Sequence, residues 1–124
     1  MASRLTTVVL FALSAAACDG DSPIAPTGDS TNVVTISAAG VSPLTIQIRV
    51  GERVQLVNND SVVHDMSSDL HPSHLRCPEI NDVGFLSTGQ SRETGNFVTP
   101  ATCTYHDHLD PLNPNLNGTI IIVE

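Results

Sequence analysis

The sequence contains no lysine and no tryptophan, and it is poor in charged residues, which make up 15% of the chain. Its 5 basic residues are therefore all arginines, and they stand against 13 acidic residues for a formal net charge of −8. Surfaces that bind nucleic acid neutralise phosphates with lysine and arginine, so this balance argues against a nucleic-acid ligand. An acidic surface still suits a basic protein partner, because opposite charges speed the encounter.

Aromatic residues make up only 3% of the chain, so its core has to be built from valine, isoleucine and leucine, which favour strands. Short strand-like segments alternate with turn residues, and no segment repeats its apolar residues at helical spacing. The segments are 33–36, 44–50, 53–58, 62–64, 94–98, 102–105 and 119–123, with one more near Phe85. This pattern predicts an all-β sandwich or barrel.

Two segments carry the clearest alternation. Leu44, Ile46, Ile48 and Val50 share one predicted face, and the pair Gly51-Glu52 predicts a turn into the next strand. A later strand is predicted to end at His64, followed by a long loop over 67–82.

The first 18 residues read as a targeting segment. Arg4 precedes an apolar run over 5–17 that is too short to span a membrane, and small residues then lead to Cys18. This resembles the lipobox of bacterial lipoproteins, which implies lipidation of Cys18; ordinary cleavage after Ala17 is the alternative. Either route exports the chain to the periplasmic side of the cell envelope or beyond it. A lipid would anchor it without spanning the membrane.

The chain therefore divides into three parts. Residues 1–18 are the predicted signal peptide, 19–32 a disordered linker, and 33–124 one folded domain, expected to be a monomer. If Cys18 carries lipid, Cys77 and Cys103 are left as a pair in an oxidising compartment, where they could form a disulfide.

Cys103 also suggests a metal site, because His106 and His108 follow it closely. A thiolate at a strand end with imidazoles in the next loop suits copper or zinc. His64, at the end of an earlier strand, could add a second imidazole. One cysteine and two histidines make a trigonal copper site.

At this point the sequence resembles the cupredoxin family, to which plastocyanin, pseudoazurin and azurin belong. The run V-G-E-R-V-Q-L-V-N-N-D leads to His64, F-x-x-x-G begins at Phe85, and G-T-I-I-I-V-E closes the chain after Cys103 and its histidine loop. The resemblance covers most of 33–124. It implies a small Greek-key β-sandwich with copper held by Cys103, His64 and one loop histidine.

Both His106 and His108 fit spacings found in that family, so the choice between them stays open. No methionine follows them as an axial ligand, and two histidines after the cysteine also resemble nitrosocyanin, a red-copper cupredoxin. Met66 shares the face of His64, but core packing by its flexible thioether is favoured over an axial role. Asp65, Asp107 and Asp110 lie beside histidines and could orient an imidazole.

A second cluster consists of His71, His74 and Cys77. Three interpretations compete: Cys77 is disulfide-bonded, the loop holds a second metal, or its histidines are solvated.

The leading functional prediction is a copper protein that carries one electron to or from an unidentified redox protein. Periplasmic copper storage, delivery or sensing is the alternative, and the extra ligands of the second cluster favour it. A third possibility is a metal-free module closed by a Cys77–Cys103 disulfide. No enzyme is expected, because no nucleophile elbow, phosphate loop or paired carboxylates are present.

Overall fold

The structure is a computed structural model that describes residues 32–124, so the predicted signal segment, Cys18 and most of the linker lie outside the described residues. Within 32–124 no helix is long and apolar enough to cross a membrane. The elements are β1 (Val33–Ser37), β2 (Gly40–Ser42), β3 (Thr45–Arg49), β4 (Gln55–Asn58), β5 (His64–Ser68), η1 (Pro78–Asp82), β6 (Gly84–Leu86), β7 (Ser91–Glu93), β8 (Ala101–Asp107), η2 (Pro114–Leu116) and β9 (Gly118–Val123).

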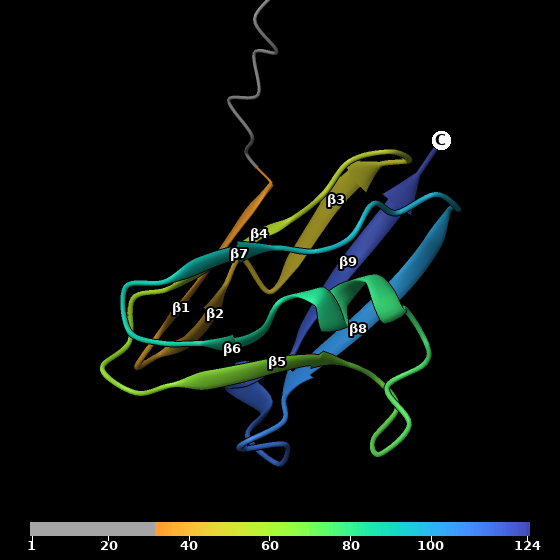
Figure 1. Ribbon diagram of the computed structural model, residues 1–124. Coiled ribbons are helices and arrows are strands. Elements are labelled where there is room, and N and C mark those ends of the chain that lie inside the picture. Colours follow the sequence, from red (N-terminus) through yellow and green to blue (C-terminus); the bar gives the residue numbers. More distant parts are fainter. Residues whose placement is uncertain (1–31) are drawn as a thin grey trace, which may run out of the picture.

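The strands form two sheets packed as a sandwich (Figure 1). One sheet has the order β2-β1-β4-β7, and the other has the order β3-β9-β8-β5-β6. Each sheet contains one parallel pair, β1 with β4 and β3 with β9, and its other neighbours are antiparallel. The predicted all-β sandwich is confirmed.

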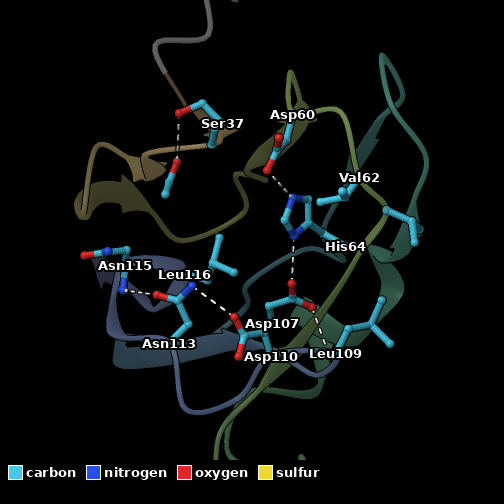
Figure 2. Close-up of a pocket in the computed structure, with 13 residues that line it drawn as sticks. Ser37, Asp60, Val62, His64, Asp107, Leu109, Asp110, Asn113, Asn115 and Leu116 are labelled. Carbon is cyan, nitrogen blue, oxygen red and sulfur yellow. Dashed lines mark hydrogen bonds and ion pairs between the residues drawn. The ribbon is translucent and has the colours of Figure 1, made fainter.

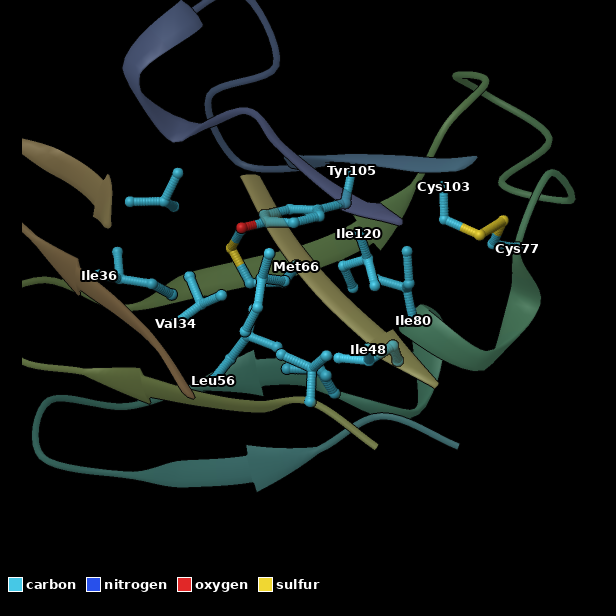
Figure 3. Packing of buried hydrophobic residues seen from close by; sticks show 14 of the residues in the cluster. Val34, Ile36, Ile48, Leu56, Met66, Cys77, Ile80, Cys103, Tyr105 and Ile120 are labelled. Atoms are coloured by element: carbon cyan, nitrogen blue, oxygen red, sulfur yellow. A yellow bond between two sulfur atoms is a disulfide. The ribbon is translucent and has the colours of Figure 1, made fainter. Parts of the chain in front are cut away.

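The core is aliphatic, as the scarcity of aromatics predicted. Ile46 and Ile48 of β3 lie directly opposite Ile120 and Ile122 of β9, and all four are at most 7% exposed. Met66 is fully buried among these side chains, which confirms its interpretation as a core residue (Figure 3). Burying each such side chain contributes about 1.5–3 kcal/mol.

The turn predicted at Gly51-Glu52 is present, but it does not join two paired strands. The segments on either side of Gly51 do not pair, because β3 joins β9 in one sheet while β4 joins β1 in the other. The chain crosses between the sheets at this turn, where Gly51 has a φ of 91°. Leu44 and Val50 lie outside β3 and are 60% and 39% exposed, so the buried face is narrower than the alternation predicted.

The strands around the predicted metal site also differ from expectation. β5 begins at His64 instead of ending there, and 94–98 is not a strand. β8 continues to Asp107, with Met66 opposite Asp107 and Ser67 opposite His106. Cys103 therefore lies in the middle of a strand, opposite Ile120, and not at its end.

Candidate metal centre

Cys103 forms a disulfide with Cys77, the residue that precedes η1, and their Cα atoms are 5.8 Å apart (Figure 3). Both residues are buried, at 5% exposure for Cys77 and 1% for Cys103. A bonded sulfur offers no thiolate, which is the form of cysteine that binds metals. Cys103 and Cys77 as metal ligands are therefore incorrect predictions, and the alternative of a disulfide is confirmed. The physical reason is the place of Cys103 within β8: it lies mid-strand with its side chain in the core, and Asp107, further along the same face, is the residue that reaches His64.

His64 lies at a cavity of about 320 Å³ between the two sheets' strand ends, and Figure 2 shows it between two carboxylates. Its Nδ1 is 2.7 Å from Asp107 Oδ2 and its Nε2 is 3.2 Å from Asp60 Oδ2. The pKa of Asp60 is lowered, chiefly by the hydrogen bond that the Ser61 N–H donates to it and further by His64. Both ring nitrogens of His64 thus face carboxylate oxygens, and His64 belongs to no group of candidate metal ligands among the described residues.

The other four histidines of the described chain lie together. One nitrogen from each of His71, His74, His106 and His108 lies within 4.8 Å of the others. His106 lies in β8 with its side chain on the face opposite that of Asp107, and His108 directly follows the last residue of the strand. His71 and His74 reach them from the loop between β5 and η1. His106 and His108 thus form one group with the two histidines of the predicted second cluster, and we call it the four-histidine cluster.

The loop that carries His71 and His74 is held in place by hydrogen bonds to its two ends. The Asn81 side chain donates to the His74 carbonyl at 2.8 Å and accepts the Ser68 N–H at 2.9 Å. The Cys77 N–H donates to Ser68 Oγ at 2.9 Å. His74 has a φ of 52°, a conformation that costs a residue with a side chain roughly 1–2 kcal/mol and persists only where its surroundings impose it.

Hydrogen bonds assign the tautomers of the two inner histidines. His74 Nδ1 lies 2.7 Å from the Ser68 carbonyl oxygen, and His106 Nδ1 lies 2.6 Å from Asp69 Oδ1. Both oxygens only accept, so each Nδ1 carries the hydrogen and donates. In the neutral imidazole each Nε2 then carries the lone pair.

These two lone pairs have no partner in the part of the chain that the structure describes. His74 Nε2 and His106 Nε2 are both buried and make no hydrogen bond. A buried polar atom without a partner costs about 1–3 kcal/mol, so native proteins rarely retain one without a reason. An imidazole whose other nitrogen donates to a carboxylate or carbonyl is the usual arrangement of a metal-bound histidine.

The outer part of the cluster is open to solvent. His71 is exposed, whereas His106 is only 4% exposed. The pKa of His71 is lowered, mainly by desolvation and further by the imidazoles of His108, His74 and His106. A lower pKa favours the neutral imidazole, which is the form that binds a metal.

Sequence reasoning missed Asp69 and Asn81, which orient His106 and fix the loop. Asp69 and His106 are 37 residues apart in the sequence, and no spacing rule connects them. Of the three aspartates considered, Asp107 does bind an imidazole, but that of His64.

The chain has a cupredoxin fold. Among similar solved structures are a purple cupredoxin from Nitrosopumilus maritimus (24% identity, 73% of this chain and 98% of that chain, TM-score 0.58) and a mutant plastocyanin of fern (19%, 73% and 99%, TM-score 0.58). An oxidised mutant of amicyanin is 18% identical, and the match covers 80% of this chain and 88% of that chain, with a TM-score of 0.59. No protein-family model matches the chain, and no curated protein matches it by sequence.

The cupredoxin resemblance implies that copper is held by Cys103, His64 and one loop histidine. These residues do not fit a metal in this chain. The thiolate of Cys103 is consumed by the disulfide, and the nitrogens of His64 face carboxylates. The four-histidine cluster does fit one, because its two buried Nε2 atoms lack any other partner among the described residues. Imidazole ligands suit copper, zinc, iron and nickel.

Proposed function

We propose that this chain is an exported copper-binding protein that holds the ion at His71, His74, His106 and His108. The observation that carries the proposal is the pair of buried, unpartnered Nε2 lone pairs on His74 and His106, inside a group of four imidazoles. Copper is supported over zinc by the fold, since the similar solved structures include a mutant amicyanin with Cu(I) and a purple cupredoxin. When bound, copper would supply one-electron chemistry; the chain's own residues bind and orient it.

Copper handling, meaning storage, delivery or sensing on the periplasmic side, is the role that the site favours. The cluster has no thiolate, and its His71 imidazole is exposed, where an incoming ligand can replace it. One-electron transfer to a redox protein is the second candidate. Its support is that plastocyanin and amicyanin with this fold have been solved in oxidised and reduced states.

Elemental analysis of the purified exported protein after incubation with copper tests the binding. We expect one copper per chain in the wild type, a loss of at least tenfold in affinity in His106→Ala, and retention in His64→Gln. His64→Gln is the matched control because it removes the fifth histidine and leaves an amide that can donate to Asp107. Circular dichroism confirms that both variants fold.

The absorption spectrum separates this site from the thiolate centre that the sequence predicted. A four-imidazole site gives weak copper bands only. An intense thiolate-to-copper band that disappears in Cys103→Ser would refute the proposal, and so would a copper affinity of His106→Ala, measured by competition titration, equal to that of the wild type. Voltammetry of the copper-loaded protein tests its role. A reversible response with rapid electron exchange between the electrode and the copper would favour electron transfer over copper handling.

Anchorage through Cys18 is also a proposal. When the full chain is expressed in a bacterium fed an alkyne-labelled fatty acid, we expect the label on the wild type and none on Cys18→Ala. A wild-type chain that is exported and cleaved without label would instead support secretion.

A further inference from the structure

The six distances between the ring centres of the four-histidine cluster all fall between 4.9 Å and 6.4 Å. They are 5.2 Å for His71–His74, 5.8 Å for His71–His106, 5.1 Å for His71–His108, 5.1 Å for His74–His106, 4.9 Å for His74–His108 and 6.4 Å for His106–His108. Each ring centre therefore lies 4.9–6.4 Å from each of the other three, a spread too small for four points in one plane. Four points with this property lie at the corners of a tetrahedron.

The alternative, a square-planar set of ligands, predicts a different pattern. With a metal–nitrogen distance of about 2.0–2.1 Å, each ring centre lies roughly 3.2 Å from the ion, so a tetrahedron gives six distances of roughly 5.2 Å. A square gives four distances of roughly 4.5 Å and two of roughly 6.4 Å, and the two long ones share no ring. Here the two longest distances share His106, and the pair opposite His106–His108 is only 5.2 Å apart.

The surrounding contacts hold two of the rings in this arrangement. Asp69 fixes the ring of His106 and the Ser68 carbonyl fixes that of His74, at 2.6 Å and 2.7 Å from the respective Nδ1 atoms. The backbone of His108 is fixed too, because its N–H donates to the Asp65 carbonyl at 2.7 Å. These contacts oppose rotation of the His74 and His106 rings away from the observed arrangement.

We infer that the four-histidine cluster is a tetrahedral site that favours Cu(I) over Cu(II). The inference rests on the proposed copper binding and adds the oxidation state of the cargo. Cu(II) bound by nitrogen prefers square-planar or tetragonal coordination. Cu(I), like Zn²⁺, has a filled d shell and no such preference, so the site resists Cu(II) while accepting Cu(I). Zn²⁺ is accordingly the expected competitor.

The test compares the affinities for Cu(I) and Cu(II) in the exported protein, using a chelator specific for each state, under anaerobic conditions for Cu(I). The informative variant is His71→Ala, which removes the exposed ring and leaves the inner pair of ligands. Water then fills the open position, and Cu(II) gains an oxygen ligand that soft Cu(I) binds poorly. Leu75→Ala, at a 73% exposed position of the same loop, is the control.

We expect the ratio of Cu(I) affinity to Cu(II) affinity to fall at least tenfold in His71→Ala and to stay unchanged in Leu75→Ala. Tenfold corresponds to about 59 mV for a one-electron couple. Electron paramagnetic resonance of the Cu(II) form gives a second readout: the wild type should show a smaller parallel hyperfine splitting than His71→Ala.

The inference would be overturned if His71→Ala left the ratio of Cu(I) affinity to Cu(II) affinity unchanged and both proteins gave ordinary tetragonal Cu(II) spectra. The proposed copper site would not be affected by that result. Failure to bind copper in either state would instead refute the proposed function. Tight Zn²⁺ binding with no measurable affinity for Cu(I) would do the same.

Discussion

The Cys77–Cys103 bond is the feature whose removal has the most calculable effect. It joins the end of the loop that carries His71 and His74 to the middle of β8, and it closes a segment of 26 residues. Replacing both cysteines with alanine opens this loop in the unfolded chain without leaving an unpaired thiol. The ligands of the four-histidine cluster remain in the sequence.

Loop-closure entropy gives the size of the effect. A cross-link over 26 residues restricts the unfolded chain by about 3.5 kcal/mol at 25 °C. For a domain of this size, that loss of unfolding free energy lowers the melting temperature by roughly 15–25 °C. Copper added to the variant should restore part of the lost unfolding free energy, since a ligand that binds only the native state stabilises that state.

Urea unfolding of the metal-free protein measures the effect, with and without a reductant. Reductant should lower the midpoint of the wild type and leave Cys77→Ala/Cys103→Ala unchanged. A wild type that loses less than about 1 kcal/mol under reduction, well short of the loop-closure value, would refute the loop-closure reasoning. Loss of copper binding by the folded double variant would point back to a thiolate ligand.

Three further predictions concern single residues. Asp69→Ala should weaken copper binding about 10- to 100-fold in a competition titration, because it removes the acceptor that orients His106, and Asp69→Asn should weaken it less. Gly118→Ala should cost about 1–3 kcal/mol in urea unfolding, since a Cβ at this position would overlap the Tyr105 hydroxyl in the core. Asp107→Asn should destabilise the fold by about 1–3 kcal/mol by placing an amide donor against the donor of His64, while copper stoichiometry stays at the wild-type value.

The sandwich was predictable because its strands bury alternate aliphatic residues. The closing strand was predicted within one residue of β9, where Gly118 begins a run whose Ile120 and Ile122 are buried. Pairing was harder to predict, since adjacent segments such as β3 and β4 look like a hairpin whether or not they belong to one sheet. Local alternation gives the face of each residue, and only the whole fold gives the partner strand.

The candidate site was half predictable. The sequence pointed to histidines as the candidate ligands, but it predicted a strand over 102–105 with His106 in the next loop, whereas β8 runs to Asp107. The loop with His71 and His74 covers the outer face of that last part of the strand. That cover depends on contacts such as Asp69 with His106, which no short-range pattern reveals.

Strand alternation also explains why the ligands lie on the outer face of the sheet. Asp107 points to the cavity at the strand ends, where its Oδ2 accepts from His64 and its Oδ1 accepts the N–H groups of Asp65 and Leu109, both at 3.0 Å. A carboxylate so engaged fills the place beside His64 where the cupredoxin resemblance put a cysteine ligand. Because neighbouring residues of a strand face opposite sides, the same register directs His106 outward, and His108 joins it from the turn that follows β8. In β8 it is Asp107, and not the neighbouring His106, that faces the cavity. This difference of one residue places the candidate metal site on the other face of the strand.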